Sequence, residues 1–422
     1  MTATAYQALT PETLPDRLGN LPALAERVGP TESWQVSEVG DGNLNLVFIV
    51  RGATGAAIVK QALPYVRLVG ESWPLPLTRS FFEYHALIRQ ADRDPGSVPE
   101  VFHFDEDQAM IVMEFLGDHI ILRQGLIAGR RYPGLGERMG LFAARTLFRG
   151  SDLSMQAPQK KADVALFSGN VELCDITENL IFSDPYYAAE MNHHTPGLDA
   201  AVARLRNDIA LKVAAQDLKL DFTARAETML HGDLHTGSVM VSDQGDYRAI
   251  DPEFAFYGPM GFDVGMLISN FLMAFMSQPG HESATGERAE YQDWLLDQTA
   301  EIWSAFSAEF TRLWQTERTG ILYQAALYED QGHAEAADIA LAGRLAAIWR
   351  DALGFCGVEM HRRVLGLAHN ADFERIEDEP RRAACEARAL ALGAAVIHGR
   401  DTIKDMPALL DLARRIASED HL

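Results

Sequence analysis

Three carboxylates in two short segments are the residues of this chain best suited to chemistry. Asp233 lies in residues 231–238, which read HGDLHTGS, and Asp251 and Glu253 lie in a second segment that reads IDPE. Phosphoryl transfer from ATP needs such a set, because one carboxylate orients the acceptor hydroxyl while others hold Mg²⁺ on the phosphates. The two segments together therefore indicate a phosphoryl-transfer site.

A β-hairpin must bring these carboxylates together. Residues 239–241 are apolar, residues 243–246 have the composition of a turn, and residues 247–250 lead directly into Asp251. This pattern predicts a strand, a tight turn and a second strand, with the acids at one end of the hairpin. A surface hairpin with solvated acids is the alternative, but two motifs at this separation rarely arise by chance.

A second hairpin upstream is predicted to hold phosphates. Strands are expected at residues 35–39, 46–51 and 56–61, with two glycines in the turn at residues 40–45 and Lys60 near the end of the third strand. Glycines let backbone N–H groups approach a ligand, and a lysine adds a point charge. An ordinary hairpin with a solvated lysine would look the same, and the downstream acids favour the phosphate cradle.

The elements after Lys60 are predicted to fix it and to form a nucleotide hinge. Residues 78–92 have helical spacing and could supply Glu83 as the acid that pins Lys60, although a solvated glutamate fits equally well. Strands are expected at residues 98–104 and 110–114. The connector after them is the candidate for main-chain contacts to adenine, and it consists of Glu114, Phe115 and Leu116.

The rest of the chain is predicted to be mostly helical. Helical spacing is found at residues 136–151, 196–220, 263–276, 285–317, 333–353, 380–398 and 406–419. We therefore expect an α+β protein of two lobes. The N-terminal lobe, residues 1–113, is an antiparallel sheet with a helix, and the C-terminal lobe, residues 114–422, is helical and carries the catalytic hairpin.

Composition limits the class of protein and of partner. A chain of 422 residues is long enough for two lobes, and its net charge of −23 argues against a nucleic-acid partner. Cys174, Cys356 and Cys385 show no pairing pattern, which fits a reducing compartment. The N-terminus has no signal-peptide pattern, and the most apolar stretch is too short to span a membrane. We expect a cytoplasmic location, with no membrane partner.

Four segments resemble a known family. They are residues 40–45 (GDGNLN), 70–74 (GESWP), 231–238 and 251–263 (DPEFAFYGPMGFD). They resemble the 5-methylthioribose kinases, which sit within the aminoglycoside phosphotransferase and choline kinase group and share the protein-kinase-like fold. The resemblance runs from about residue 36 to about residue 375. It implies that ATP phosphorylates the 1-hydroxyl of S-methyl-5-thio-D-ribose in methionine salvage, giving ADP and the 1-phosphate, and it suggests a homodimer.

The resemblance also implies roles for single residues. Asp233 would be the catalytic base beside the sugar hydroxyl. Lys60 would meet the α- and β-phosphates, and Asn43 would lie in the hairpin over the nucleotide. The segment of Asp251, Pro252 and Glu253 would lie at the nucleotide, with its two acids holding Mg²⁺.

Two arginines and a tryptophan are implied to lie at the substrate. The family has arginines that close on the substrate or on the developing phosphate charge, and Arg344 and Arg362 take these positions here, with Arg363 adjacent to the second. Arginine suits this role because its planar fork of donors matches phosphoryl oxygens. Trp73 would belong to a mobile loop over the sugar.

One position departs from the wider group. Protein kinases and aminoglycoside kinases carry an Asn five residues after the catalytic Asp, where it helps to bind a second metal, and this chain has Ser238. A serine is a poorer metal ligand, so a second metal site would be absent or completed by Glu253. The methylthioribose kinases also show this serine.

Three other functions fit the sequence less well than a sugar kinase. A kinase for an aminoglycoside, choline or homoserine has the same fold, but the Trp73 loop and the two arginines favour a sugar. A pseudokinase serving as an interaction module would have lost a catalytic carboxylate or the strand lysine, and none of these is missing. A protein kinase would show Asp-Phe-Gly and Ala-Pro-Glu segments around an activation loop, which this sequence lacks.

Overall fold

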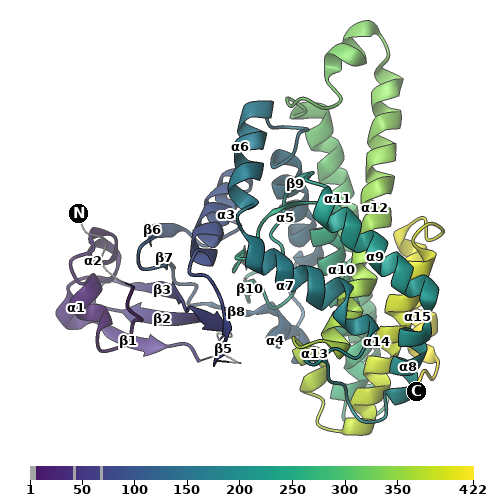
Figure 1. Ribbon diagram of the computed structural model, residues 1–422, viewed down its shortest axis with the longest axis horizontal. Coiled ribbons are helices and arrows are strands. Elements are labelled where there is room, and N and C mark those ends of the chain that lie inside the picture. Colours follow the sequence, from purple (N-terminus) through teal and green to yellow (C-terminus); the bar gives the residue numbers. More distant parts are fainter. Residues whose placement is uncertain (1–5, 41–43, 67–69) are drawn as a thin grey trace.

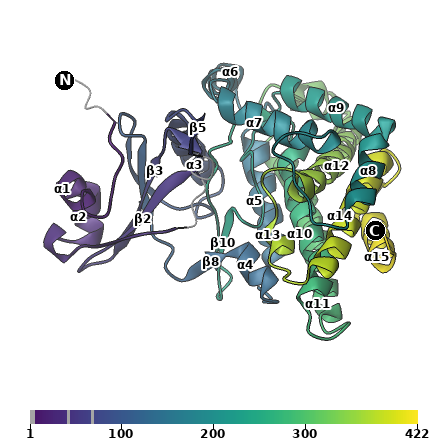
Figure 2. The ribbon, with the colours of Figure 1, turned by 60° about the horizontal axis from the view of Figure 1, so that its bottom comes forward.

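The protein consists of a sheet-containing N-terminal lobe and a larger helical C-terminal lobe, which lie on the left and right of Figure 1. The computed structural model describes residues 6–40, 44–66 and 70–422. Figure 2 shows that the two lobes meet along the face that carries α3 (Arg79–Arg93), β8 (His119–Ile121) and β10 (Val239–Ser242). The predicted α+β class and two-lobe organisation are confirmed.

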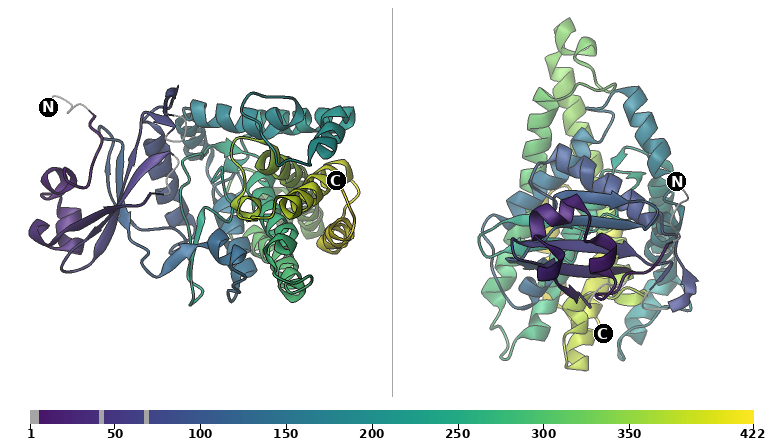
Figure 3. Two further views of the ribbon diagram at one scale, coloured as in Figure 1. Left: turned by 90° about the horizontal axis from the view of Figure 1, so that it is seen from below. Right: turned by 90° about the vertical axis from the view of Figure 1, so that its left-hand side faces the viewer.

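The N-terminal lobe is built on one antiparallel sheet with the strand order β1-β2-β3-β7-β6. Its strands are β1 (Gln35–Glu38), β2 (Asn45–Arg51), β3 (Ala56–Ala62), β6 (Val101–Asp105) and β7 (Met110–Glu114). The short helices α1 (Leu14–Leu18) and α2 (Pro22–Val28) pack on one face through apolar residues such as Leu24, Phe48 and Val59. Figure 3 shows these two helices in front of the sheet.

The alternation of β3 sets the direction of Lys60. Ala57 and Val59 pack towards α1 and α2, so the residues between and after them face the other side, where α3 lies. Lys60 is therefore buried beneath α3 and faces the C-terminal lobe. A one-residue shift of this strand would turn Lys60 towards α1 and α2.

The C-terminal lobe is organised around α10 (Gly261–His281), which is buried along almost its whole length. Its neighbours α11 (Ala289–Thr316) and α12 (Ala334–Leu365) form a long hairpin that rises above the rest of the lobe in Figure 1. The other helices are α4 (Leu122–Ile127), α5 (Leu135–Arg149), α6 (Ala157–Phe167), α7 (Val171–Phe182), α8 (Asp199–Asn207), α9 (Ile209–Ala224), α13 (Ala371–Glu374), α14 (Glu379–Gly399) and α15 (Met406–Ser418).

The catalytic hairpin has the predicted form. Strand β10 pairs antiparallel with β11 (Tyr247–Ala249) on one side and with β8 on the other. Two short pairs complete the strands, namely β9 (Thr228–Met229) with β12 (Tyr257–Gly258) and β4 (Tyr65–Val66) with β5 (Gly70–Pro74). Because β8 follows β7 directly and pairs in the C-terminal lobe, the chain crosses between the lobes after Glu114. The exact boundary between residues 113 and 114 stays a prediction.

Two helical predictions were wrong in detail. The helix expected at residues 196–220 is two helices, because Asp208 interrupts it and its side chain accepts the Leu211 N–H at 2.9 Å to cap α9. The helix expected at residues 333–353 continues to Leu365. This extension matters, because its last three turns carry Arg362 and Arg363.

No helix in the described part of the chain is long and apolar enough to cross a membrane.

A buried histidine ties the end of α12 to its neighbours. His361 Nε2 donates to the Leu390 carbonyl at 3.1 Å, and its Nδ1 accepts the Tyr186 hydroxyl at 3.0 Å. Both bonds suit a neutral ring, and burial lowers the pKa of His361 from 6.5 to about 4. The ring therefore takes up a proton more readily in the unfolded chain than in the folded protein.

This histidine should make the protein less stable in acid. Its stabilising contribution is fully present above pH 6.5 and is lost as the pH falls towards 4, so at pH 5 about 2 kcal/mol should be lost. A His361→Gln variant should lose about 2 kcal/mol less unfolding free energy between pH 7.5 and pH 5 than the wild type. Urea unfolding at both pH values measures this, with the exposed His333→Gln as control. Equal losses in wild type and His361→Gln would refute the assignment.

Candidate active site

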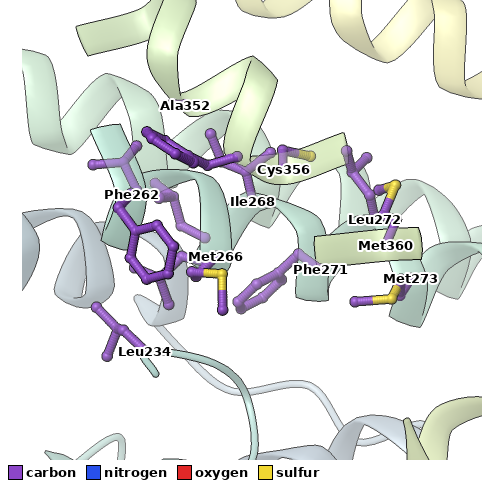
Figure 4. Close-up of a cluster of buried hydrophobic side chains, with 14 of the residues drawn as sticks. Leu234, Phe262, Met266, Ile268, Phe271, Leu272, Met273, Ala352, Cys356 and Met360 are labelled. Carbon is purple, nitrogen blue, oxygen red and sulfur yellow. The ribbon is translucent and has the colours of Figure 1, made fainter. Parts of the chain in front are cut away.

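The loop that carries Asp233 is fixed to α10 at two points. Gly232 has a φ of 85°, and a Cβ there would lie 2.1 Å from the Phe254 carbonyl oxygen, so only glycine fits. Asp263, in the first turn of α10, accepts the N–H groups of His231 at 2.7 Å and Gly232 at 3.2 Å. Leu234 inserts beside Phe262 and Met266 of α10, as Figure 4 shows.

Asp233 is surrounded by donors. Its Oδ2 accepts from His235 Nε2 at 3.1 Å, and its Oδ1 accepts from Arg363 Nη2 at 3.0 Å and from Arg362 Nη1 at 3.4 Å. Burial by itself raises the pKa of Asp233, but the interactions with His235, Arg363 and Arg362 outweigh it and hold the pKa well below its usual value. Asp233 is therefore ionised at neutral pH and able to accept a hydroxyl proton.

The two histidines of the loop have fixed tautomers. His235 Nδ1 accepts the Gly237 N–H at 2.9 Å, so the proton sits on Nε2 and points at Asp233. Burial lowers the pKa of His235 to about 4, which keeps this ring neutral. His231 Nε2 donates to the Ile250 carbonyl at 3.0 Å and so links the loop to the strand that leads into Asp251. His231 thus supports the loop.

Ser238 closes the loop from inside. Its hydroxyl donates to the Asp233 carbonyl oxygen at 2.8 Å and accepts the His235 N–H at 2.9 Å. Both contacts are with the main chain of the loop, and Ser238 is buried. The hydroxyl is therefore occupied in holding the turn in which protein kinases place a metal-binding Asn.

A second group of carboxylates gathers around Lys60. Oxygens of Glu83, Asp251 and Glu253 all lie within 4.8 Å of one another. Lys60 Nζ donates to Glu83 Oε1 at 2.8 Å and forms a close ion pair with Asp251. Burial lowers the pKa of Lys60, but the three carboxylates outweigh it and raise the pKa above its usual value. Glu83 is thus the acid that holds Lys60, as the helix at residues 78–92 suggested.

Asp251 and Glu253 differ in exposure. Asp251 has a φ of 67° and a side chain 46% exposed, so its carboxylate projects from the chain into the space between the lobes. Glu253 is buried, and its Oε2 meets Asn45 Nδ2 at 3.2 Å and Arg79 Nε at 3.3 Å. Burial and the charge of Asp251 raise the pKa of Glu253. Pro252, between them, is buried as well.

The predicted nucleotide hinge lies where the lobes join. The Glu114 N–H donates to the Glu100 carbonyl at 2.8 Å, and the Glu114 carboxylate accepts the Glu100 N–H at 3.1 Å. Phe115 stacks beneath Arg51, with the guanidinium carbon 4.5 Å from the ring centre, and Leu116 is buried. The adenine contact of these three residues stays a prediction. Asn43 lies outside the described residues.

Trp73 lies against the segment that follows the carboxylates. It is half-buried on β5 and packs in a small apolar cluster with Leu75, Leu173 and Phe254, the residue directly after Glu253. A groove of about 510 Å³ opens beside it, lined also by Ile176 and other residues of α7. The position fits a residue at the edge of a site between the lobes.

The structure brings Arg362 and Arg363 to Asp233 but does not bring Arg344 there. Arg344 lies 18 residues before Arg362 on the same helix, which is about 27 Å at 1.5 Å per residue. Its guanidinium faces Glu227 at 3.4 Å. We therefore leave Arg344 out of the site and include Arg363, which the sequence left open.

Sequence reasoning missed two residues that hold the site. Asp263 is the last residue of the segment 251–263 that resembles the family, but no function was assigned to it from the sequence. Its place at the end of that segment was the only sequence feature that pointed to it. Arg79 is fully buried and donates to the carbonyls of Leu44 and Leu63, both at 2.5 Å, besides facing Glu253. Arginine side chains are usually exposed, so nothing in the sequence around Arg79 indicated that its guanidinium group is buried at the site.

Known proteins similar to this chain are phosphotransferases, which is consistent with the carboxylates, lysine and arginines gathered at this site. The model of the phosphotransferase enzyme family matches residues 35–302. A methylthioribose kinase of Escherichia coli O45:K1 is 44% identical over 97% of this chain and 98% of its own length. Methylthioribose kinase 1 of Oryza sativa subsp. japonica is 44% identical, over 90% of this chain and 88% of its own. A methylthioribose kinase of Citrobacter koseri is 42% identical, over 92% and 94%. This chain belongs to the phosphotransferase enzyme family and, within it, to the methylthioribose kinases.

Proposed function

We propose that this protein transfers the γ-phosphoryl group of ATP to the 1-hydroxyl of S-methyl-5-thio-D-ribose, giving ADP and the 1-phosphate, as a step of methionine salvage. The observation that carries this proposal is the carboxylate of Asp233 held between His235 and two arginines. The Lys60 cluster at the lobe junction supplies the nucleotide side of the same site. The family membership narrows the acceptor to the thiosugar.

The residues present suit Mg²⁺, the cation expected with ATP. Carboxylate oxygens are the ligands that Mg²⁺ prefers, and three carboxylates converge here. Burial and the neighbouring charge of Asp251 raise the pKa of both Glu83 and Glu253, so a cation would relieve a real repulsion. Asp251 and Glu253 would hold the ion, while Glu83 stays on Lys60. When bound, Mg²⁺ neutralises charge on the phosphates.

Each residue at the site would have a distinct role in the reaction. Lys60 would bind the α- and β-phosphates as a point charge, while Asp233 would accept the proton of the sugar hydroxyl. Arg362 and Arg363 would stabilise charge on the transferred phosphoryl group or bind the sugar, because guanidinium donors match those oxygens. Trp73 would cover the sugar. The homodimer and the cytoplasmic location expected from the sequence stay predictions.

The acceptor can be identified directly. A coupled assay of ADP release should show turnover with methylthioribose, and much weaker turnover with ribose, choline, homoserine and kanamycin. Ribose is the most similar acceptor in the panel, because it differs from methylthioribose only by a 5-hydroxyl in place of the methylthio group. Product analysis by ³¹P NMR should place the phosphate on the anomeric oxygen. Turnover confined to any other acceptor of the panel would contradict the proposed substrate.

Asp233 should be required for transfer but not for nucleotide binding. Asp233→Asn keeps the shape of the side chain but removes the base, so kcat should fall on the order of 10²- to 10⁴-fold. The Kd for Mg·ATP, measured by calorimetry, should stay within about threefold, because Lys60 and its carboxylates are unchanged. Asp243→Asn, an exposed acid in the turn of the same hairpin, is the control. Near wild-type kcat in Asp233→Asn would rule out the base assignment.

The two arginines named from the sequence should behave differently. Arg362→Ala should lower kcat/KM for methylthioribose by about 10²-fold, the usual cost of losing one charged donor at a reacting group. Arg344→Ala should stay within about threefold of wild type, because its partner is Glu227. Steady-state kinetics of both variants measure kcat/KM for methylthioribose and so test whether only Arg362 acts at the site. A loss in Arg344→Ala as large as in Arg362→Ala would show that the site extends along α12.

A further inference from the structure

A carboxylate buried behind the two arginines is not accounted for by the roles above. Glu359 lies on α12, is 0% exposed, and precedes Arg362 and Arg363 by three and four residues. This spacing places all three side chains on one face of the helix. Glu359 Oε1 accepts from Arg363 Nε at 2.5 Å, and Oε2 accepts from Arg362 Nη1 at 3.2 Å.

The contacts of the two arginines are unequal. Arg363 uses separate nitrogens, with Nε on Glu359 and Nη2 on Asp233 at 3.0 Å. Arg362 uses the single nitrogen Nη1 for both carboxylates, at 3.2 Å and 3.4 Å. The Nε of Arg362 is buried and has no hydrogen-bond partner among residues 6–40, 44–66 and 70–422. Arg363 thus uses two nitrogens for the two carboxylates, whereas Arg362 uses only Nη1 and keeps Nη2 without a partner in the described part of the chain.

The charges of this group balance. Two guanidinium groups and the carboxylates of Asp233 and Glu359 sum to zero in a buried setting. Removing one carboxylate would leave an uncompensated cation, which is costly away from water. Without Glu359, both arginines would also lose the contact that fixes their position relative to Asp233, since Asp233 and Glu359 are the only carboxylates paired with either of them in the described part of the chain.

We propose that Glu359 is a positioning residue for phosphoryl transfer. It fixes Arg363 on Asp233, and it holds Arg362 by Nη1 alone, so that Nη2 of Arg362 is the free donor that can meet an oxygen of the acceptor sugar. Glu359 touches no reacting atom, because it acts through the arginines. This inference rests on the proposed function, since it assigns the free donor to the acceptor of that reaction.

The first experiment compares Glu359→Gln with wild type. The amide keeps the volume and one acceptor oxygen but loses the charge, so kcat should fall at least about tenfold and the KM for methylthioribose should rise at least about threefold. The Kd for Mg·ATP should stay within about twofold. Glu386→Gln is the matched control, because Glu386 is equally buried, at 1%, but lies on α14 near Thr195 and Arg382. It should keep wild-type kcat and KM.

A double-mutant cycle separates positioning from a general structural role. Lysine has no guanidinium Nε for Glu359 to hold, so only the contact with Arg362 remains, and Glu359→Gln should lower kcat by a clearly smaller factor in an Arg363→Lys background than in the wild type. A purely structural role predicts equal losses in both backgrounds. If Glu359→Gln does not fold, as judged by circular dichroism, Glu359→Asp replaces it. That variant keeps the charge but is one methylene shorter, so it should show the same changes at smaller size.

Failure of this inference differs from failure of the proposed function. The wild type is assayed first against the acceptor panel, and the cycle is then run with whichever acceptor it phosphorylates. A wild type inactive with methylthioribose but active with another acceptor overturns the proposed substrate alone. Wild-type kcat and KM in folded Glu359→Gln, or additive losses in the cycle, overturn the role of Glu359.

Discussion

The burial of charge at the junction of the lobes is the constraint on which this site depends. Lys60 comes from the sheet, Glu83 from α3, and Asp251 from the hairpin of the C-terminal lobe, and the lysine forms an ion pair with each carboxylate. Each is buried or faces a buried partner, so none could be left alone without a large cost. The ion pair between Lys60 and Asp251 therefore joins the two lobes directly, at the place where we propose that the nucleotide binds.

The contact of Glu253 with Asn45 and Arg79 is a second place where buried polar and charged groups join the two lobes. Glu253, two residues after Asp251, is held by Asn45 and Arg79 of the N-terminal lobe, and Arg79 in turn binds the main chain at Leu44 and Leu63. Leu44 is the last residue before β2, next to the turn expected to cover the nucleotide, and Leu63 follows β3 and precedes the segment that leads to Trp73. One buried guanidinium thus connects a carboxylate that would hold Mg²⁺ to both segments expected to cover the ligands.

Asp233 is positioned by a different part of the molecule. Its loop is fastened to α10 by the Asp263 carboxylate and by Leu234, and its side chain is met by arginines from the last turns of α12. Because α10 and α12 pack closely along their length, the loop and the arginines share one rigid frame. A rigid frame suits phosphoryl transfer, in which positioning and charge neutralisation supply most of the rate.

Local sequence patterns were enough to predict the type of reaction and the fold class. The HGDLHTGS and DPE segments, a lysine on the third strand and helical spacing beyond residue 122 are local patterns, and local patterns report strands, helices and hairpins. The sequence also restricted the family through the long run from Asp251 to Asp263. All of these inferences depend on residues close together in the chain.

Only the tertiary structure decided which distant side chains meet. Arg344 and Arg362 looked equivalent in the sequence, but about 27 Å of helix separates them, and packing brings only the second to Asp233. Arg79 and Glu253 are 174 positions apart, and Glu359 and Asp233 are joined only through side chains. Sequence separation carries no information on such distances, because they are set by how whole helices pack against one another.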